Sequence, residues 1–250
     1  MSARPPRILV IAGSDSSGGA GIQADIKTIT MLGGYAMTAI TAVTAQNTRG
    51  VAGVEALSPN FVAAQIDACL EDIGADAVKI GMLGSADIAE VVADRLEDLG
   101  KPIVFDPVMV ATSGSVLADE ATVEVFEWLM ELATLTTPNV PELEALGGAS
   151  GMASRGVAYL AKGGDADGPM VEDRLVRPGK VDVVWSDARI VTKHTHGTGC
   201  TLSSAIATHL GHGLDLERGI AEARLFVREA LKSAPGFGFG NGPLGHQAVR

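Results

Sequence analysis

Short apolar runs alternate with longer stretches of helical spacing over most of this 250-residue chain. Buried strands are expected at residues 7–12, 36–45, 77–80, 102–105 and 133–137. Helices are expected between them, at residues 22–32, 61–73, 86–99 and 118–132. Strands and helices that alternate in this way form right-handed βαβ units around a mainly parallel sheet. The pattern therefore predicts an α/β protein.

Polar or glycine-rich groups follow directly after these strands. They are residues 13–21, Gln46-Asn47, Gly81-Met82, Asp106, Asn139 and residues 162–164. The carboxyl ends of the strands of an open parallel sheet share one edge, and ligands bind there. We therefore expect these groups to form a single site.

Length and composition limit the remaining possibilities. Hydrophobic residues make up 46% of the chain, which is long enough for one large domain, and we expect a single domain over residues 1–250. The formal charge of −11 disfavours binding to nucleic acid. No apolar run is long enough for a membrane span, and the run after the N-terminus is too short for a signal peptide, so a cytoplasmic location is expected. The two cysteines give no disulfide framework and no zinc spacing.

A glycine-rich turn at residues 194–200 precedes an apolar helix-like run. Gly197, Thr198 and Gly199 would leave backbone N–H groups unpaired at a helix N-terminus, which favours phosphate binding. Cys200 would lie at the same N-terminus, where the pKa of a thiol tends to fall, and it is a candidate base. The alternative is a turn that caps a buried helix, with Cys200 as a small core residue.

Several further residues have both a functional and a structural interpretation. Asp25 would accept hydrogen bonds from a ligand, or it is a favourable acid at a helix start. Asn139 and Glu142 would orient magnesium through water, or they cap a helix. Lys162 would reach phosphate oxygens, or it is a solvated lysine in a turn.

Another group of residues lies in apolar or turn positions. Met82 and Val108 offer apolar walls for a flat ring, although core packing explains either one alone. His194 and His196 have the spacing of metal ligands, but no further ligands cluster with them, so turn or surface positions are expected. Residues 147–156 show no clear helix, residues 171–187 are expected to form edge strands, and residues 234–245 are expected to form a loop or flap.

A rival function comes from residues 19–24, which match the dinucleotide-binding pattern G-x-G-x-x-A after a strand. That pattern needs an acidic residue at the end of the second strand to bind the ribose. Gln46-Asn47 stands there, and no acid precedes Glu55. A dinucleotide-dependent oxidoreductase therefore remains an alternative with a weak motif.

Taken together, the motifs resemble those of the hydroxymethylpyrimidine and phosphomethylpyrimidine kinases of thiamine synthesis, in the ribokinase-like superfamily. The resemblance covers nearly the whole chain. Its most specific stretches, in chain order, are residues 12–27, 44–50, 79–83, 137–139 with Glu142, 162–164 and 195–202. It implies a ribokinase-like three-layer sandwich with a mainly parallel central sheet flanked by helices. It also implies a homodimer.

The resemblance further implies a reaction and its residues. ATP with Mg²⁺ would phosphorylate the hydroxymethyl group of 4-amino-5-hydroxymethyl-2-methylpyrimidine, and a second step would convert the monophosphate to the diphosphate. The pyrimidine pocket would comprise Gly13, Asp25, Gln46, Met82 and Val108. Cys200 stands where related sugar kinases carry an aspartate base, and Gly197, Thr198 and Gly199 resemble their anion hole. Asp106, Asn139 and Glu142 resemble the magnesium and phosphate set, with Lys162 balancing the triphosphate.

The sequence departs from this family in three places. The segment between Glu142 and Lys162 is short, as if a helix–strand unit had been trimmed. Asp165 stands where a histidine is usual, and the C-terminal end is short. The nearest alternative is a pyridoxal or pyridoxine kinase, since both substrates are flat rings bearing a hydroxymethyl group. A non-catalytic pyrimidine-binding protein is the other alternative, because the short segment would remove turnover and keep the pocket.

Overall fold

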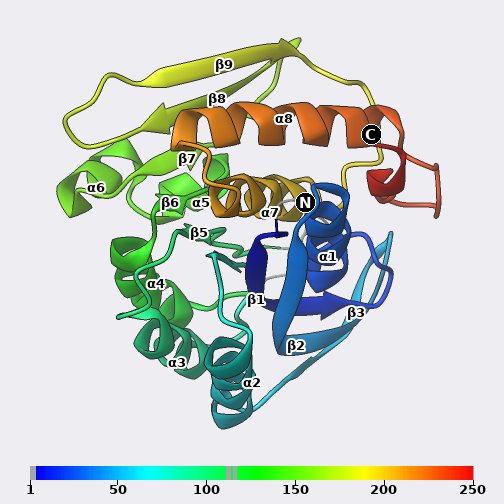
Figure 1. Cartoon of the computed structure of the whole chain (residues 1–250). Coiled ribbons are helices and arrows are strands. Elements are labelled where there is room, and N and C mark those ends of the chain that lie inside the picture. Colours follow the sequence, from blue (N-terminus) through cyan, green and yellow to red (C-terminus); the bar gives the residue numbers. More distant parts are fainter. Residues whose placement is uncertain (1–3, 111–113, 115–116, 250) are drawn as a thin grey trace.

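The computed structural model describes residues 4–110, 114 and 117–249 (Figure 1). The strands are β1 (Arg7–Asp15), β2 (Tyr35–Asn47), β3 (Gly50–Ala56), β4 (Ala77–Ile80), β5 (Ile103–Phe105), β6 (Leu135–Thr136), β7 (Tyr159–Ala161), β8 (Met170–Val176) and β9 (Val183–Ala188). The helices are α1 (Gly21–Met31), α2 (Pro59–Asp72), α3 (Ala86–Leu96), α4 (Glu120–Leu132), α5 (Val140–Ala145), α6 (Gly148–Arg155), α7 (Thr198–Gly211) and α8 (Leu216–Lys232), with a short 3₁₀ turn η1 (His246–Ala248).

The strands form a single sheet in the order β3-β2-β1-β4-β5-β6-β7-β8-β9. The pairs from β2 through β1 to β7 are parallel, while β3, β8 and β9 pair antiparallel at the two edges. The parallel centre brings the carboxyl ends of β1, β4, β5, β6 and β7 to one edge of the sheet. This is the edge at which the sequence predicts the site.

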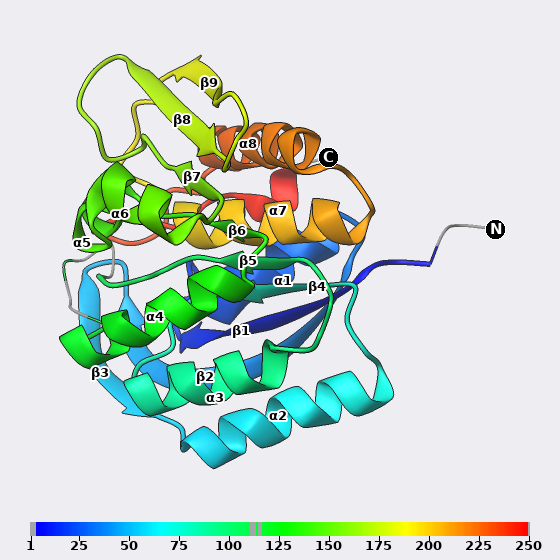
Figure 2. The ribbon, with the colours of Figure 1, turned by 90° about the vertical axis from the view of Figure 1, so that its left-hand side faces the viewer.

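The sheet is covered by helices on both faces (Figures 1 and 2). Side chains of β1 alternate between two apolar clusters, because successive residues of a strand point to opposite faces. Leu9 and Ile11 pack in the cluster that contains α2, α3 and α4. Ile8 and Val10 pack in the cluster that contains α1, α7 and α8. The predicted three-layer α/β sandwich is therefore confirmed.

The predicted strands and helices agree with the structure to within a few residues at their ends. The edge strands expected at residues 171–187 form β8 and β9. Side-chain caps mark several helix starts, since Ser58, Ser85, Asp119 and Asp215 each accept a hydrogen bond from a backbone N–H three residues on. None of the helices in the described part of the chain has the length and apolar character that a membrane span requires.

The prediction for residues 147–156 is wrong. They form α6, and the strand β7 that follows runs parallel to β6, so the helix–strand unit is present in a short form. Glycines bound this helix in the left-handed region, Gly147 at φ 89° and Gly156 at φ 66°. Met152 anchors it, since its side chain is fully buried in the core under the sheet. A short helix between two glycine caps needs little apolar periodicity, which explains why the pattern did not indicate it.

Candidate active site

A cavity of about 610 Å³ opens at the carboxyl edge of the parallel strands, and the N-terminus of α7 also lines it. Small-molecule sites commonly have this size. The predicted site residues that line it are Gly13, Gln46, Met82, Asp106, Val108, Asn139, Glu142, Lys162, Gly197, Thr198, Gly199 and Cys200. The structure thus brings together residues from the two ends of the chain around one space.

Asp25 is the predicted site residue that does not line this cavity. Its side chain is fully buried, and both carboxylate oxygens lie within 3.1 Å of the Lys79 ammonium nitrogen. Ser204 of α7 donates a further hydrogen bond of 2.6 Å to Asp25 Oδ1. Burial would lower the pKa of Lys79, but attraction to Asp25 outweighs it and raises that pKa. The expected contact between Asp25 and a ligand is therefore replaced by internal partners.

The N-terminus of α7 forms a glycine-rich cradle at the cavity floor. Gly197 is the N-cap, with a left-handed φ of 89°, and an added Cβ there would lie 1.9 Å from the Gly19 carbonyl oxygen. An added Cβ at Gly199 would lie 3.4 Å from Lys162 Nζ and 3.5 Å from Asp106 Oδ2. The helix N-terminus therefore faces one cationic and one anionic side chain directly, and its backbone N–H groups favour an anion.

Lys162 lies between two carboxylates beside this cradle. Its Nζ is 2.7 Å from Asp106 Oδ1 and 3.8 Å from Glu142 Oε2. Thr137 donates a hydrogen bond of 3.0 Å to Asp106, and burial would raise the pKa of Asp106, but Lys162 outweighs it and lowers that pKa. Burial raises the pKa of Glu142 to about 7, and the neighbouring Asp106 adds to this rise while Lys162 opposes it. The cluster therefore holds carboxylate oxygens and one ammonium group within reach of a phosphate on α7.

Asn139 and Glu142 form the helix cap that the sequence offered as the alternative to a metal site. Asn139 Oδ1 accepts from the Glu142 N–H at 2.8 Å, and Glu142 Oε2 accepts from the Asn139 N–H at 2.8 Å. This reciprocal pair is a capping box at the start of α5. Both residues also line the cavity, so the cap holds the Glu142 carboxylate at the cavity wall.

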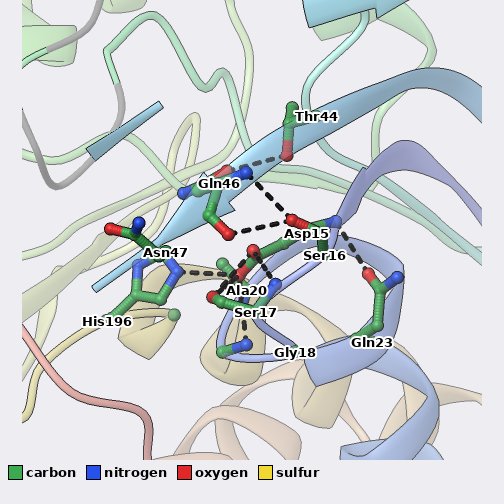
Figure 3. A network of polar contacts seen from close by, with 12 residues as sticks. Asp15, Ser16, Ser17, Gly18, Ala20, Gln23, Thr44, Gln46, Asn47 and His196 are labelled. Carbon is green, nitrogen blue, oxygen red and sulfur yellow. Dashed lines mark hydrogen bonds and ion pairs between the residues drawn. The ribbon is translucent and has the colours of Figure 1, made fainter. Parts of the chain in front are cut away.

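Apolar side chains and a glycine line another part of the cavity. Met82 follows β4, Val108 follows β5, and Gly13 lies in β1. An added Cβ at Gly13 would lie 2.2 Å from Met82 Cε, so the glycine makes room for the Met82 side chain. Gln46 Oε1 accepts a hydrogen bond of 3.0 Å from Thr44, which orients the amide so that its oxygen faces Thr44 (Figure 3). Among the described residues the Gln46 amide nitrogen has no hydrogen-bond partner, so it can donate to a ligand.

The prediction of a lowered pKa for Cys200 is wrong. Cys200 lies in the first turn of α7 and lines the cavity, but burial raises the pKa of its thiol to about 11, although Lys79 opposes the rise. The neighbouring carboxylates of Asp25 and Asp106 add to the rise. Desolvation and two nearby negative charges therefore outweigh the helix N-terminus, and the thiol is protonated at neutral pH.

The second correction concerns His196, which was expected in a turn or at the surface: it lies in the loop before α7, but it is buried. Its Nε2 lies 2.8 Å from Asp15 Oδ2 (Figure 3). Asp15 ends β1 and also accepts from the backbone N–H groups of Ser17, Gly19 and Ala20. Burial opposes ionisation of Asp15, but the hydrogen bonds from His196 and Ser17 outweigh it and lower the pKa to about 2.

The sequence reasoning missed Asp15 and Lys79 as residues of the site. Both line the cavity. Lys79 is the one charged side chain inside the short apolar strand β4, which is a signal that it has a buried partner. Asp15 is the last residue of β1, but its partner His196 is far away in the sequence, and only the fold joins them. In the described residues no group of three or more His, Cys, Asp or Glu side chains has the arrangement of a metal site.

The dinucleotide motif does not have the geometry of a dinucleotide site. In such a site the N–H groups at the start of the helix bind the pyrophosphate. Here the Gly19 and Ala20 N–H groups are bonded to Asp15 Oδ2 at 3.0 and 2.8 Å. Asp15 thus occupies the position at which an anion would bind.

Known proteins resemble this chain over nearly all of its length. A hydroxymethylpyrimidine/phosphomethylpyrimidine kinase of Synechococcus elongatus is 43% identical over 255 residues, a match that covers 96% of this chain and 97% of that protein. A bifunctional thiamine biosynthesis protein of Geobacter sulfurreducens is 44% identical over 253 residues. That match covers 96% of this chain but 52% of that protein, so the chain spans about half of its length.

Solved structures and a family model agree with these matches. Bacillus subtilis pyridoxal kinase, solved as an ADP complex, has a TM-score of 0.87 and 31% identity, covering 99% of both chains. The family model described as phosphomethylpyrimidine kinase matches residues 15–245. The chain therefore belongs to the phosphomethylpyrimidine kinase family.

Proposed function

We propose that the protein transfers the γ-phosphoryl group of ATP to 4-amino-5-hydroxymethyl-2-methylpyrimidine, and then to the resulting monophosphate, in thiamine biosynthesis. The observation that carries this proposal is the set of chemical groups that line the cavity. One side offers apolar walls and an unpaired amide nitrogen, and the other offers a helix N-terminus with a lysine. A flat heteroaromatic ring and a phosphate chain would each find a matching surface. The names of the relatives support the same reaction.

The pyrimidine would bind between Met82 and Val108, with Gln46 at its edge. Gln46 has a fixed orientation because Thr44 donates to its oxygen and Ser16 hydrogen-bonds to its backbone. A donor that is fixed in this way loses little freedom when it bonds a ring nitrogen, which favours affinity. Asp25 has no part in this contact, since Lys79 and Ser204 occupy its oxygens.

The phosphate chain would bind at the start of α7. Backbone N–H groups of Gly199 and Cys200 would stabilise the charge that spreads over the transferring group, while the Thr198 N–H is bonded to the Thr195 carbonyl at 3.3 Å. Lys162 would bind phosphate oxygens from the side, which requires it to share its charge between the phosphate and Asp106. ATP supplies the phosphoryl group, and these residues align it with the hydroxymethyl oxygen.

Magnesium fits the donor chemistry of this corner. Asp106 and Glu142 present carboxylate oxygens around one ammonium group, and a bound cation would favour the ionised form of Glu142, whose pKa is about 7. Mg²⁺ prefers oxygen ligands and keeps several waters, so two carboxylates and phosphate oxygens suffice. Asp106 and Glu142 would hold the ion, which would neutralise phosphate charge, and Asn139 would fix Glu142 through the capping box.

Cys200 is not proposed as a thiolate base, because its thiol pKa of about 11 leaves it protonated. Phosphoryl transfer has a loose transition state in which the acceptor oxygen needs little prior deprotonation. In the second step the acceptor is a phosphate monoester, which is already anionic at pH 7. A neutral thiol at this position would line the acceptor site without repelling that anion.

The test is ADP release with ATP and Mg²⁺, offering hydroxymethylpyrimidine and pyridoxal in parallel and identifying products by mass. Pyrimidine mono- and diphosphates are expected. Pyridoxal is the second candidate because the pyridoxal kinase of Bacillus subtilis matches the full chain at a TM-score of 0.87. Phosphorylation of pyridoxal alone would replace the proposal. Binding of the pyrimidine with no ADP release would favour the non-catalytic alternative.

The cytoplasmic location and the homodimer stay predictions. Sedimentation velocity at several protein concentrations tests the second, with a concentration-independent species of twice the 25.6 kDa chain mass expected.

A further inference from the structure

Two loops that are distant in sequence meet at the cavity with almost no space between their backbones. An added Cβ at Gly19 would lie 2.4 Å from His196 Cδ2, and one at Gly197 would lie 1.9 Å from the Gly19 carbonyl oxygen. The first loop follows β1 and leads into α1, and the second precedes α7. Their relative placement therefore decides how the pyrimidine side of the cavity faces the phosphate side.

One side-chain pair joins the two loops. His196 Nε2 and Asp15 Oδ2 are 2.8 Å apart, and the two side chains are 6% and 3% exposed. Asp15 is ionised and can only accept, so His196 donates its Nε2–H. The same Asp15 oxygen accepts from the N–H groups of Gly19 and Ala20. We call this contact the Asp15–His196 clasp.

The two residues of the clasp are close in sequence to the phosphate cradle and to the ring pocket. His196 directly precedes Gly197, the N-cap of the phosphate cradle. Asp15 closely follows Gly13, which makes room for Met82 in the ring pocket. The backbone N–H of His196 is also bonded to the Gly242 carbonyl at 3.1 Å, so the histidine itself is fixed from the C-terminal side.

We propose that His196 is a positioning residue, which holds the phosphate-binding helix N-terminus at the reacting distance from the pyrimidine loop by bonding Asp15. This inference rests on the proposed kinase activity. A buried, charge-assisted hydrogen bond resists stretching, and a shift of about 1 Å between reacting groups can cost about 100-fold in rate. Each substrate would still bind its own loop if the clasp were broken.

The test compares His196→Leu, which removes the donor, with His196→Gln, whose amide nitrogen restores one. The expected result for His196→Leu is a fall in kcat of about 10- to 100-fold with little change in the dissociation constants of the pyrimidine and of a non-hydrolysable ATP analogue. His196→Gln should recover most of the lost kcat. Asp76→Asn is the matched control, because Asp76 pairs with Arg7 at the opposite end of the same strand β1 and should leave kcat unchanged.

A second readout does not depend on turnover. Hydrogen exchange in His196→Leu should become faster in residues 13–24 as well as in residues 194–202, while in Asp76→Asn neither segment should change. Wild-type kcat in His196→Leu, or exchange that changes in the second segment alone, overturns the proposal. If the wild-type protein phosphorylates no pyrimidine, the proposed function fails, and the exchange result still decides whether the clasp couples the two loops.

Discussion

Lys79 Nζ lies 3.0 Å from Asp25 Oδ2, and neither side chain is exposed to solvent. The pair joins β4 to α1 directly below the cavity, and Ser204 of α7 completes it. It therefore connects the sheet to α1 and α7, whose N-termini line the cavity.

Replacing Lys79 by Met should lower the free energy of unfolding strongly. The change leaves a buried carboxylate without its cation, which costs about 3–5 kcal/mol. Urea unfolding measures the loss. The control is a variant in which the exposed ion pair between Arg95 and Asp67 is broken. Its free energy of unfolding should fall by less than about 1 kcal/mol. A loss for Lys79→Met as small as that of the control would show that Asp25 is held by other means.

Replacing Gln46 by Ala should weaken binding of the pyrimidine. The loss of one or two hydrogen bonds to a buried ring costs about 1–3 kcal/mol, which titration calorimetry measures. Gln65→Ala is the matched control, since Gln65 bonds only backbone groups of Ile40 and Phe61 away from the cavity. Equal affinity of Gln46→Ala and the wild-type protein for the pyrimidine would show that Gln46 does not contact the bound ring.

The raised pKa of Cys200 predicts a thiol that reacts slowly. In a Cys69→Ser variant Cys200 is the only thiol of the chain, so its alkylation by iodoacetamide can be followed alone. The rate should stay low at pH 8 and rise only as the pH approaches 11, because alkylation requires the thiolate. Unfolding in urea should restore the reactivity of an ordinary cysteine. Fast alkylation of Cys200 in the folded protein at pH 7 would show that the thiol is ionised there, and Cys200 could then act as the base.

The central strands and most helices could be predicted because their signals are local. Each strand is a short apolar run, and each of the predicted helices has apolar spacing between glycine or polar ends. Strand β3 gave no such signal, since most of its residues are exposed and it pairs only at the edge. Helix α8 was missed although Asp215 caps it and its buried face includes Ile220, Ala223 and Phe226.

The site was predictable in position more than in chemistry. Strand ends in a parallel sheet meet, so placing Gln46, Asp106 and Lys162 near one another needed only the strand assignments. The state of each group depends on partners that the sequence does not reveal. Cys200 keeps its proton because its thiol is buried and because Asp25 and Asp106 are near it, and the buried His196 is hydrogen-bonded to Asp15.

The lowered pKa of Asp15 predicts a loss of stability in acid. The pKa of Asp15 falls from its usual 3.8 to about 2 in the folded protein. As the pH drops, Asp15 therefore binds a proton in the unfolded state before it does so in the folded state. The contribution is fully present well above pH 3.8 and disappears as the pH falls through about 2. Its size is about 2 kcal/mol. Urea unfolding of the wild-type protein and Asp15→Asn at pH 6 and pH 2.5 should show their stabilities converging in acid, whereas a constant difference contradicts the assignment.

Replacing Gly199 by Ala tests the phosphate site without disturbing the fold. The added Cβ would meet Lys162 Nζ at 3.4 Å and Asp106 Oδ2 at 3.5 Å, which are ordinary contacts, so stability should be kept. The methyl group would occupy the space that a phosphate needs at the helix N-terminus. The KM for ATP should rise by about tenfold or more, equivalent to about 1.4 kcal/mol.

Gly219→Ala in α8 is the matched control for this change. Its added Cβ would also make ordinary contacts, at 3.5 Å from His209 Cβ and 3.8 Å from Leu210 Cδ2, away from the cavity. Alanine in a helix interior is favoured over glycine by about 1 kcal/mol, so this variant should gain stability and keep its KM. If Gly199→Ala also keeps its KM for ATP while both variants fold, the phosphate chain does not bind at the start of α7.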